Sequence, residues 1–182
     1  MGLVALVRSD LAAAGSWFGH PYSHLFPNVF VAASHRLAHA LDQRGLRPVA
    51  QVVAVICFTL TGAEIRPGAQ IGPGFVVIHP SAIVIGNDVV AGRDLVLFGK
   101  NTIGRTHDPA HERGGSPVIG DGVHVGTTSS ILGPITVGDG VQIGANCLVA
   151  TDVPDGARTR SAVAEVHERP RGDGGLDARR QG

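Results

Sequence analysis

The amino-acid sequence predicts an all-β fold, a parallel β-helix of six-residue repeats, with a short helical region before it. The 182 residues include 26 glycines, and only 16% are charged and 4% aromatic, which suits tight turns around a core of small aliphatic side chains. Much of the chain also repeats with a period of six, which matches neither a helix nor a simple alternating strand. We expect a helical region over 1–60, the β-helix over 61–155 and a tail over 156–182.

Within the helical region, apolar residues recur at helical spacing over 28–44. Asn28 is the expected N-cap of this helix and Gly45 its expected C-cap. Pro48 opens a second apolar helix over 49–60. That helix is about half as long as the roughly 20-residue helix needed to span a membrane. We therefore expect it to be buried, with a peripheral membrane contact as the alternative.

The β-helix is predicted by stepping six residues at a time from Ile65. Aliphatic residues that favour strands occupy twelve of the fifteen positions. They are Ile65, Ile71, Val77, Ile83, Val89, Leu95, Ile119, Val125, Ile131, Val137, Ile143 and Val149. Each unit is expected to form one short strand and one turn, and each coil stacks its aliphatic side chains on the next.

The three exceptions to the repeat are consecutive: Asn101, His107 and Arg113. They fall in a segment rich in Gly, Pro, His and charge, so we expect a loop over 104–117 that projects from the stack. The spacing between Leu95 and Ile119 is a multiple of six, which predicts that the register resumes in phase. A functional loop on a rigid scaffold and a tolerated surface insertion both fit this pattern.

The remaining composition excludes several classes of protein. Lys plus Arg and Asp plus Glu both number 15, and no basic block is present, so a nucleic-acid partner is not expected. Two cysteines, Cys57 and Cys147, and no signal-peptide pattern at the start indicate a cytoplasmic protein. The charged, Gly-rich segment after Pro154 is expected to be poorly ordered beyond about Val166.

Several motifs, in order and at fixed spacing, resemble a known family. They are HRLAH at 35–39, AEIRPGAQIG at 63–72, IH at 78–79, NDVVAG at 87–92, PVIGDGV at 117–123 and VP at 153–154. Residues 34–155 resemble the serine acetyltransferase group of hexapeptide-repeat transferases, especially the serine-acetyltransferase-like enzymes of exopolysaccharide assembly, such as the colanic acid type. The resemblance implies a left-handed helix, a homotrimer or dimer of trimers with sites between subunits, and acetyl-CoA as the donor.

The resemblance also implies the catalytic pair. His79 stands at the position of the family's general base, and Glu64 stands at the acidic residue fifteen positions earlier that orients it. The chemistry needs such a pair, because an alcohol must lose its proton to a base with a pKa near the working pH and within about 3 Å. Histidine has an unperturbed pKa of about 6.5, and a carboxylate on its other ring nitrogen fixes the tautomer.

Three small residues match family regions that line the acyl-CoA groove, namely Gly104, Thr127 and Ala145. Small residues allow the pantetheine arm to approach the backbone, although turns require them as well. His107 and His111 are candidate substrate contacts from the loop, or solvated loop residues.

The acceptor is the least determined part of the function. The family's acidic residue beside the base and the basic pair of its loop, which recognise serine, are replaced by Ile78 and by Gly115 and Ser116. We therefore expect an O-acetyltransferase acting on a hydroxyl of a small molecule or sugar, with a serine O-acetyltransferase of cysteine biosynthesis as the alternative. A zinc carbonic anhydrase on the same scaffold and a non-catalytic scaffold subunit are the other classes considered.

No metal is expected in this chain. His35 and His39 have the i, i+4 spacing of a zinc-chelating pair, but a third nearby ligand is missing. They are expected to be helix-packing residues.

Overall fold

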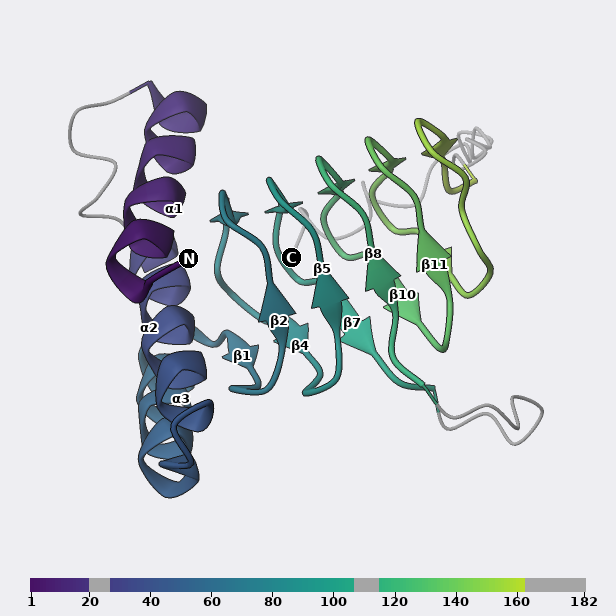
Figure 1. The fold of residues 1–182 in the computed structure, drawn as a ribbon. Coiled ribbons are helices and arrows are strands. Elements are labelled where there is room, and N and C mark those ends of the chain that lie inside the picture. Colours follow the sequence, from purple (N-terminus) through teal and green to yellow (C-terminus); the bar gives the residue numbers. More distant parts are fainter. Residues whose placement is uncertain (20–26, 107–114, 163–182) are drawn as a thin grey trace, which may run out of the picture.

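The computed structural model describes residues 1–19, 27–106 and 115–162. Three helices lie together at one end of a stack of short coils (Figure 1). They are α1 (Leu3–Phe18), α2 (Pro27–Asp42) and α3 (Arg47–Thr61). α2 packs between α1 and α3, and all three helices contact strands of the first coil. The helical region therefore forms a cap on the open end of the stack.

The coils consist of short parallel strands that form three sheets. The first sheet contains β1 (Glu64–Ile65), β4 (Val84–Ile85), β7 (Thr102–Gly104), β10 (Ser130–Leu132) and β13 (Leu148–Val149). The second sheet contains β2 (Gln70–Ile71), β5 (Val90–Ala91), β8 (Val118–Ile119) and β11 (Thr136–Val137). The third sheet contains β3 (Val76–Val77), β6 (Val96–Leu97), β9 (His124–Val125), β12 (Gln142–Ile143) and β14 (Arg158–Thr159).

This topology confirms the expected coil of parallel strands after a helical region. Within the described residues, the all-β prediction holds only after Thr61, because three helices precede the first strand. No described helix has both the length and the apolar character needed to cross a membrane.

The prediction of an unbroken six-residue register was wrong. Glu64 pairs with Val84, 20 residues later, whereas Val84 pairs with Thr102, 18 residues later. Thr102 then pairs with Ser130, 28 residues later. The first coil therefore has two extra residues and the third has ten, and their sum is two whole repeats. Because of that coincidence, the register after the loop matches the register of the first coil.

The shift was invisible in the sequence because two positions of each repeat point inward. Ile83 and Ile85 are both fully buried, so aliphatic residues at a period of six fit either register. Asn101 is likewise an inward residue and not part of the loop. Its side chain accepts a hydrogen bond from the Gly99 N–H and donates one to the Gly126 carbonyl, which satisfies it within the core.

The helix boundaries agree in part with those expected. Gly45 adopts a left-handed conformation, with a φ of 77°, just after α2, as a C-cap requires. Asn28 is not an N-cap, because α2 begins at Pro27 and places Asn28 inside the first turn. α1 was not predicted as a separate helix. The expectation that the helix over 49–60 is buried was wrong, because only Ala50 and Cys57 of α3 are buried. Residues 107–114 of the loop, and the tail from 163, lie outside the described residues.

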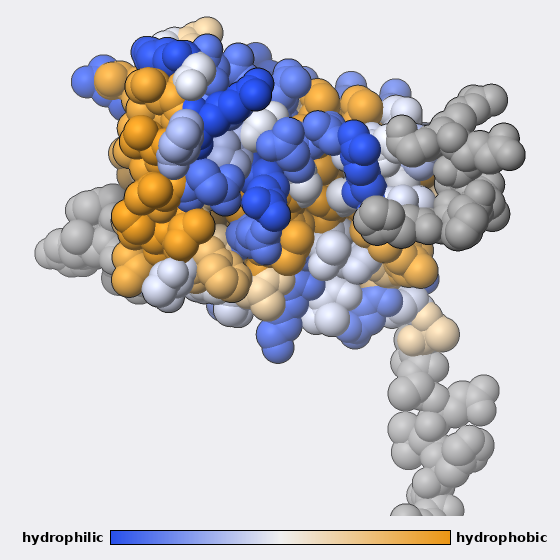
Figure 2. Space-filling view, turned by 90° about the horizontal axis from the view of Figure 1, so that it is seen from below, coloured by the Kyte–Doolittle hydropathy of each residue, from blue (hydrophilic) through white to orange (hydrophobic). Residues whose placement is uncertain are grey.

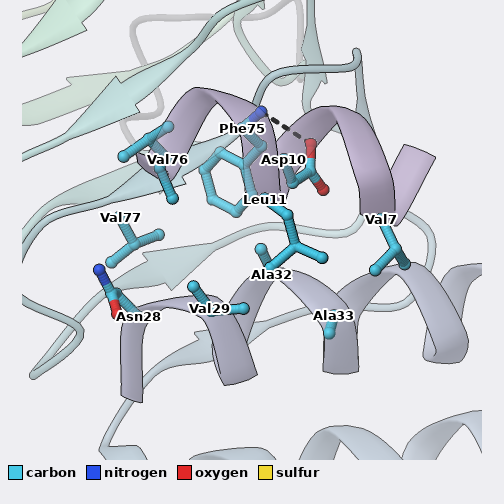
Figure 3. Close-up of a pocket in the computed structure, with 11 residues that line it drawn as sticks. Val7, Asp10, Leu11, Asn28, Val29, Ala32, Ala33, Phe75, Val76 and Val77 are labelled. Carbon is cyan, nitrogen blue, oxygen red and sulfur yellow. Dashed lines mark hydrogen bonds between the residues drawn. The ribbon is translucent and has the colours of Figure 1, made fainter. Parts of the chain in front are cut away.

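A buried ion pair joins the helices to the first coil. Arg36 of α2 donates from Nε to Asp10 Oδ2 of α1 at 2.8 Å, and the two side chains are only 2% and 5% exposed. Asp10 Oδ1 accepts from the backbone N–H of Gly74 at 3.0 Å. It also accepts from the backbone N–H of Phe75 at 2.9 Å (Figure 3). Arg36 also donates to the carbonyls of Ile71 and Gly72. Both charges are therefore satisfied by hydrogen bonds, the condition under which a buried pair is tolerated.

Removing one charge of this pair should strongly destabilise the fold. We expect Asp10→Asn to lower the free energy of unfolding by about 3–5 kcal/mol, because the Arg36 charge stays buried without its partner. Asp88→Asn, which breaks an exposed pair with Arg105, should cost no more than about 1 kcal/mol. Urea unfolding at one fixed protein concentration measures both. Equal losses in the two variants would contradict this role for the buried pair.

His35 is a second buried polar residue of α2. It is 3% exposed, and neither ring nitrogen has a hydrogen-bond partner. Burial, the charge of Arg36 and the nearby His39 together lower the pKa of His35 to about 3. Because the unfolded chain binds this proton near pH 6.5 and the folded chain does not, stability is complete above pH 6.5 and is lost as the pH falls towards 3.

The acid sensitivity should depend on His35. Below pH 6.5 this residue should lower the unfolding free energy by about 1.4 kcal/mol per pH unit. We expect His35→Leu to have a shallower loss of stability between pH 6.5 and pH 4 in urea unfolding experiments. His79→Gln, which removes an exposed histidine, should follow the wild-type slope. Parallel curves for His35→Leu and wild type would show that His35 does not titrate in this way.

Candidate active site

His79 lies in the turn that joins the third sheet to the first sheet in the first coil. This turn is two residues longer than the equivalent turns of the next three coils, and it leaves the His79 side chain exposed. Its backbone lies against Gly99 in the next coil. A Cβ on Gly99 would sit 2.5 Å from the His79 carbonyl oxygen, and Gly99 has a φ of 114°, so only glycine fits there. His79 is thus held on a rigid support.

The equivalent turns of the following coils continue below His79 as a column of small residues. Thr127 donates from Oγ1 to the Gly99 carbonyl at 3.1 Å, and Asn146 donates its N–H to the Thr127 carbonyl. Ala145 precedes Asn146 in the next turn. Lys100, Thr128 and Asn146 all have positive φ in these turns, which keeps the column tightly wound. The backbone along this edge is therefore open to a ligand.

A groove of about 660 Å³ follows this edge. His79 stands at its first coil, and Thr127 and Ala145 line it. These are two of the three residues predicted to bind the donor, and that role stays a prediction. The other described residues in its lining are Phe98, His124, Gly126, Gln142, Ile143, Gly144, Arg158, Thr159 and Arg160. From His79 to Arg158 is four coil steps of roughly 4.8 Å, or about 19 Å, so the groove suits an elongated ligand.

The far end of the groove carries positive charge. Arg158 and Arg160 are exposed there, on and beside the last strand. Sequence reasoning missed both arginines because they stood in a segment predicted to be a tail. One signal in the sequence could have indicated Arg158. It lies one coil after Gln142, whose side chain points outward, so Arg158 occupies the same outward position in the next coil.

A smaller cavity of about 300 Å³ meets the groove at His79. The described residues that line it are Phe18, Pro27, Asn28, Ile78, His79 and Pro80. It lies between the helical cap and the first coil. His79 borders both cavities, so its imidazole ring can contact a ligand in either cavity.

An aromatic cluster stands beside the groove. Trp17 of α1 makes edge contacts with Phe98 and with His124, at ring-centroid distances of 5.8 and 5.4 Å. These contacts pack the end of α1 against the outer face of the third sheet. They also place the single tryptophan of the chain next to the candidate site.

Glu64 does not contact His79 in the described part of the chain. Its carboxylate forms an ion pair with Arg66, with Oε1 and Nε 3.1 Å apart. Glu64 begins β1 and Arg66 directly follows this strand in extended chain, so the two side chains face the same side. The structure thus leaves the predicted pairing of Glu64 with His79 untested.

The other candidates are placed as follows. Gly104 is buried in β7, outside the described lining of the groove, so its role in donor binding stays a prediction. His107 and His111 lie outside the described residues. Among the residues that the structure does describe, no group of three or more His, Cys, Asp or Glu could hold a metal ion. His39 Nδ1 is 2.8 Å from the Pro67 carbonyl oxygen, a contact that ties α2 to the first coil.

Comparison with known proteins identifies the family. Residues 116–151 match the family model described as bacterial transferase hexapeptide (six repeats). The chain is 35% identical to a serine acetyltransferase of Helicobacter pylori over 164 residues, which cover 90% of this chain and 93% of that protein. The chain belongs to the serine acetyltransferase family. It is therefore an acetyl-CoA-dependent O-acyltransferase, as the sequence motifs predicted.

Solved structures of serine acetyltransferases share its fold. Isoform 3 from Entamoeba histolytica, in complex with cysteine, superposes with a TM-score of 0.79 at 27% identity, over 92% of this chain. The soybean serine acetyltransferase in complex with serine gives a TM-score of 0.78 at 31% identity, over 86% of this chain. The chain spans 62% and 65% of the lengths of these two proteins, respectively.

Blocking the groove should weaken binding of acetyl-CoA in this serine acetyltransferase relative. We expect Ala145→Leu to raise the KM for acetyl-CoA by about tenfold with little change in kcat, because the added side chain fills part of the groove that is predicted to hold the pantetheine arm. Ala150→Leu is the matched control, since Ala150 is exposed outside the described lining of the groove. Initial rates of CoA release test both. An unchanged KM for acetyl-CoA in Ala145→Leu would show that the donor does not bind along this groove.

Proposed function

We propose that this protein transfers the acetyl group of acetyl-CoA to a hydroxyl of a small molecule or sugar, with His79 as the general base. The observation that supports it most is that His79 borders both cavities. The long groove suits the donor, and the smaller cavity suits the acceptor. A base between the two can reach the hydroxyl while that hydroxyl faces the thioester.

The proposed reaction balances with these two substrates alone. A ring nitrogen of His79 accepts the proton of the acceptor hydroxyl as its oxygen attacks the thioester carbonyl carbon. A new C–O bond forms and the C–S bond breaks. The proton on His79 then passes to the departing thiolate, which leaves as CoA thiol. The products are the acetyl ester and free CoA.

Glu64 is proposed as the residue that orients the His79 ring. The family resemblance supports this role, and the spacing of fifteen residues matches it. The carboxylate would first have to leave Arg66, which it contacts on the exposed side of β1. Exposed pairs of this kind are weak, typically below about 1 kcal/mol, so the exchange costs little.

The donor is proposed to lie along the column of turns, with its thioester at His79. Thr127 and Ala145 would flank the pantetheine arm, and Gly104 stays a predicted contact. Arg158 and Arg160 stand where the phosphate groups of CoA would end, and arginine binds phosphate through paired N–H groups. Two free, buried cysteines and an acetyl-CoA donor fit a cytoplasmic enzyme. His107 and His111 stay candidate substrate contacts.

Serine is the alternative acceptor. The Helicobacter pylori relative is a serine acetyltransferase, and the soybean structure contains serine. Against it, Ile78 stands beside the base where the family carries an acidic residue.

We further propose a left-handed winding and a homotrimer, as the family resemblance implies. Exposed aliphatic residues on the outer faces of the first two sheets support lateral association of copies; they are Val84, Val90, Val118 and Leu148. The helical end is also apolar over α3, where Val49, Val52, Val55, Ile56, Phe58 and Leu60 are exposed (Figure 2). Burial of that end between two trimers would give the dimer of trimers.

Loss of the base should abolish most of the activity. We expect His79→Ala to lower kcat by 10²–10⁴-fold, because general base catalysis contributes about that factor. Its far-UV circular dichroism and unfolding free energy should match the wild type, since the side chain is exposed. Glu64→Gln should be milder, because an orienting group contributes less than the base. A near-normal rate for His79→Ala at saturating acceptor would remove His79 from the mechanism.

A further inference from the structure

The smaller cavity beside His79 has an unusual lining for a site that would hold an amino acid. Among its described lining residues, Phe18, Pro27, Ile78 and Pro80 are apolar. The remaining described residues are His79 itself and Asn28. None of these six described residues is Asp, Glu, Lys or Arg. A ligand held there meets apolar surface and two neutral polar groups when His79 is in the basic, uncharged form.

Asn28 is the polar group of this cavity that the fold leaves unused. It is 4% exposed, and its Oδ1 has no hydrogen-bond partner. Figure 3 places Asn28 at the start of α2 near Val77, on the far side of Val29 and Ala32 from Val7. Buried amides are nearly always hydrogen-bonded, so an unpaired one at the wall of a cavity indicates a missing partner. Because the side-chain amide of Asn can be flipped, it can present either its oxygen or its NH₂ group to a ligand.

We propose that this cavity binds the acceptor, and that the acceptor is an uncharged alcohol with an apolar body and one further polar group that pairs with the Asn28 amide. This inference rests on the proposed function, because it assumes that His79 deprotonates the bound hydroxyl. Free serine carries an ammonium and a carboxylate, and neither finds an opposite charge in the described lining. A charge buried without its partner is strongly disfavoured, so the cavity discriminates against such a molecule.

The first test compares two acceptors that share a hydroxyl and differ in charge. L-serine and N-acetyl-L-serine methyl ester present the same primary hydroxyl, but the ester lacks both charges. With acetyl-CoA as donor, we expect kcat/KM for the ester to exceed that for L-serine by at least about tenfold, corresponding to about 1.4 kcal/mol. Release of CoA thiol gives the rate, and mass spectrometry of the acetylated product excludes simple hydrolysis. An equal or greater kcat/KM for L-serine would overturn the inference.

Variants of the lining test the role of each wall. Asn28→Ala should raise the KM for the ester by about tenfold while the KM for acetyl-CoA stays unchanged, which a general loss of structure would not produce. Ile78→Asp should raise kcat/KM for L-serine methyl ester relative to that for N-acetyl-L-serine methyl ester, because the ammonium of the first ester gains a counter-charge. Ile78→Leu should leave this ratio unchanged. If Ile78→Asp and Ile78→Leu have the same preference, or if Asn28→Ala changes both KM values alike, this cavity is not the acceptor site.

A binding measurement separates this inference from the proposed function. Trp17 is the only tryptophan. Its ring contacts Phe98 and His124 of the adjoining groove, and its neighbour in sequence, Phe18, lines the smaller cavity, so its fluorescence reports on ligands at the junction of the two. If no acceptor, L-serine included, supports CoA release, the proposed function fails. Saturable binding of N-acetyl-L-serine methyl ester, weakened by Asn28→Ala and absent for L-serine, would still support the inference. No fluorescence change with the ester, or tighter binding of L-serine, would overturn it.

Discussion

The buried ion pair between Asp10 and Arg36 fixes the helical cap on the first coil, and the geometry of the candidate site depends on it. The pair links α1 and α2 to the backbone between Ile71 and Phe75. The end of α1 and the start of α2 supply one wall of the smaller cavity, through Phe18 and Pro27. The opposite wall belongs to the coil that carries His79. The pair therefore joins the two helices that form one wall of the cavity to the coil that forms the other.

The stack of coils contributes the second constraint. Its strands hold the backbone rigidly, and the extra two residues of the first coil occur where the chain turns past His79. A turn as short as those of the following coils would lack the two extra residues beside His79. The longer turn instead presents the imidazole to both cavities, while Gly99 allows the backbone to pack closely beneath it. A functional side chain on such a support can be held in a productive position without a closing loop.

Much of the fold could be predicted from the sequence, because the period of six is a strong signal for short parallel strands. The family resemblance pointed to His79, Thr127 and Ala145, and these three residues line one groove, while their roles stay predictions. The exact register could not be predicted, because Ile83 and Ile85 are equally buried and equally aliphatic. The Asp10–Arg36 pair was missed because its partners are 26 residues apart and belong to different helices. The smaller cavity was missed for the same reason, since Asn28 and Pro80 approach only in the folded chain.

The central claim is that His79 stands between the donor and the acceptor. A crystal structure of the protein with CoA bound tests it most directly. We expect the CoA sulfur to lie within about 4 Å of the His79 ring, at the junction of the two cavities, with the phosphate groups beside Arg158 and Arg160. A CoA molecule bound along another edge of the stack, or with its sulfur far from His79, would contradict it.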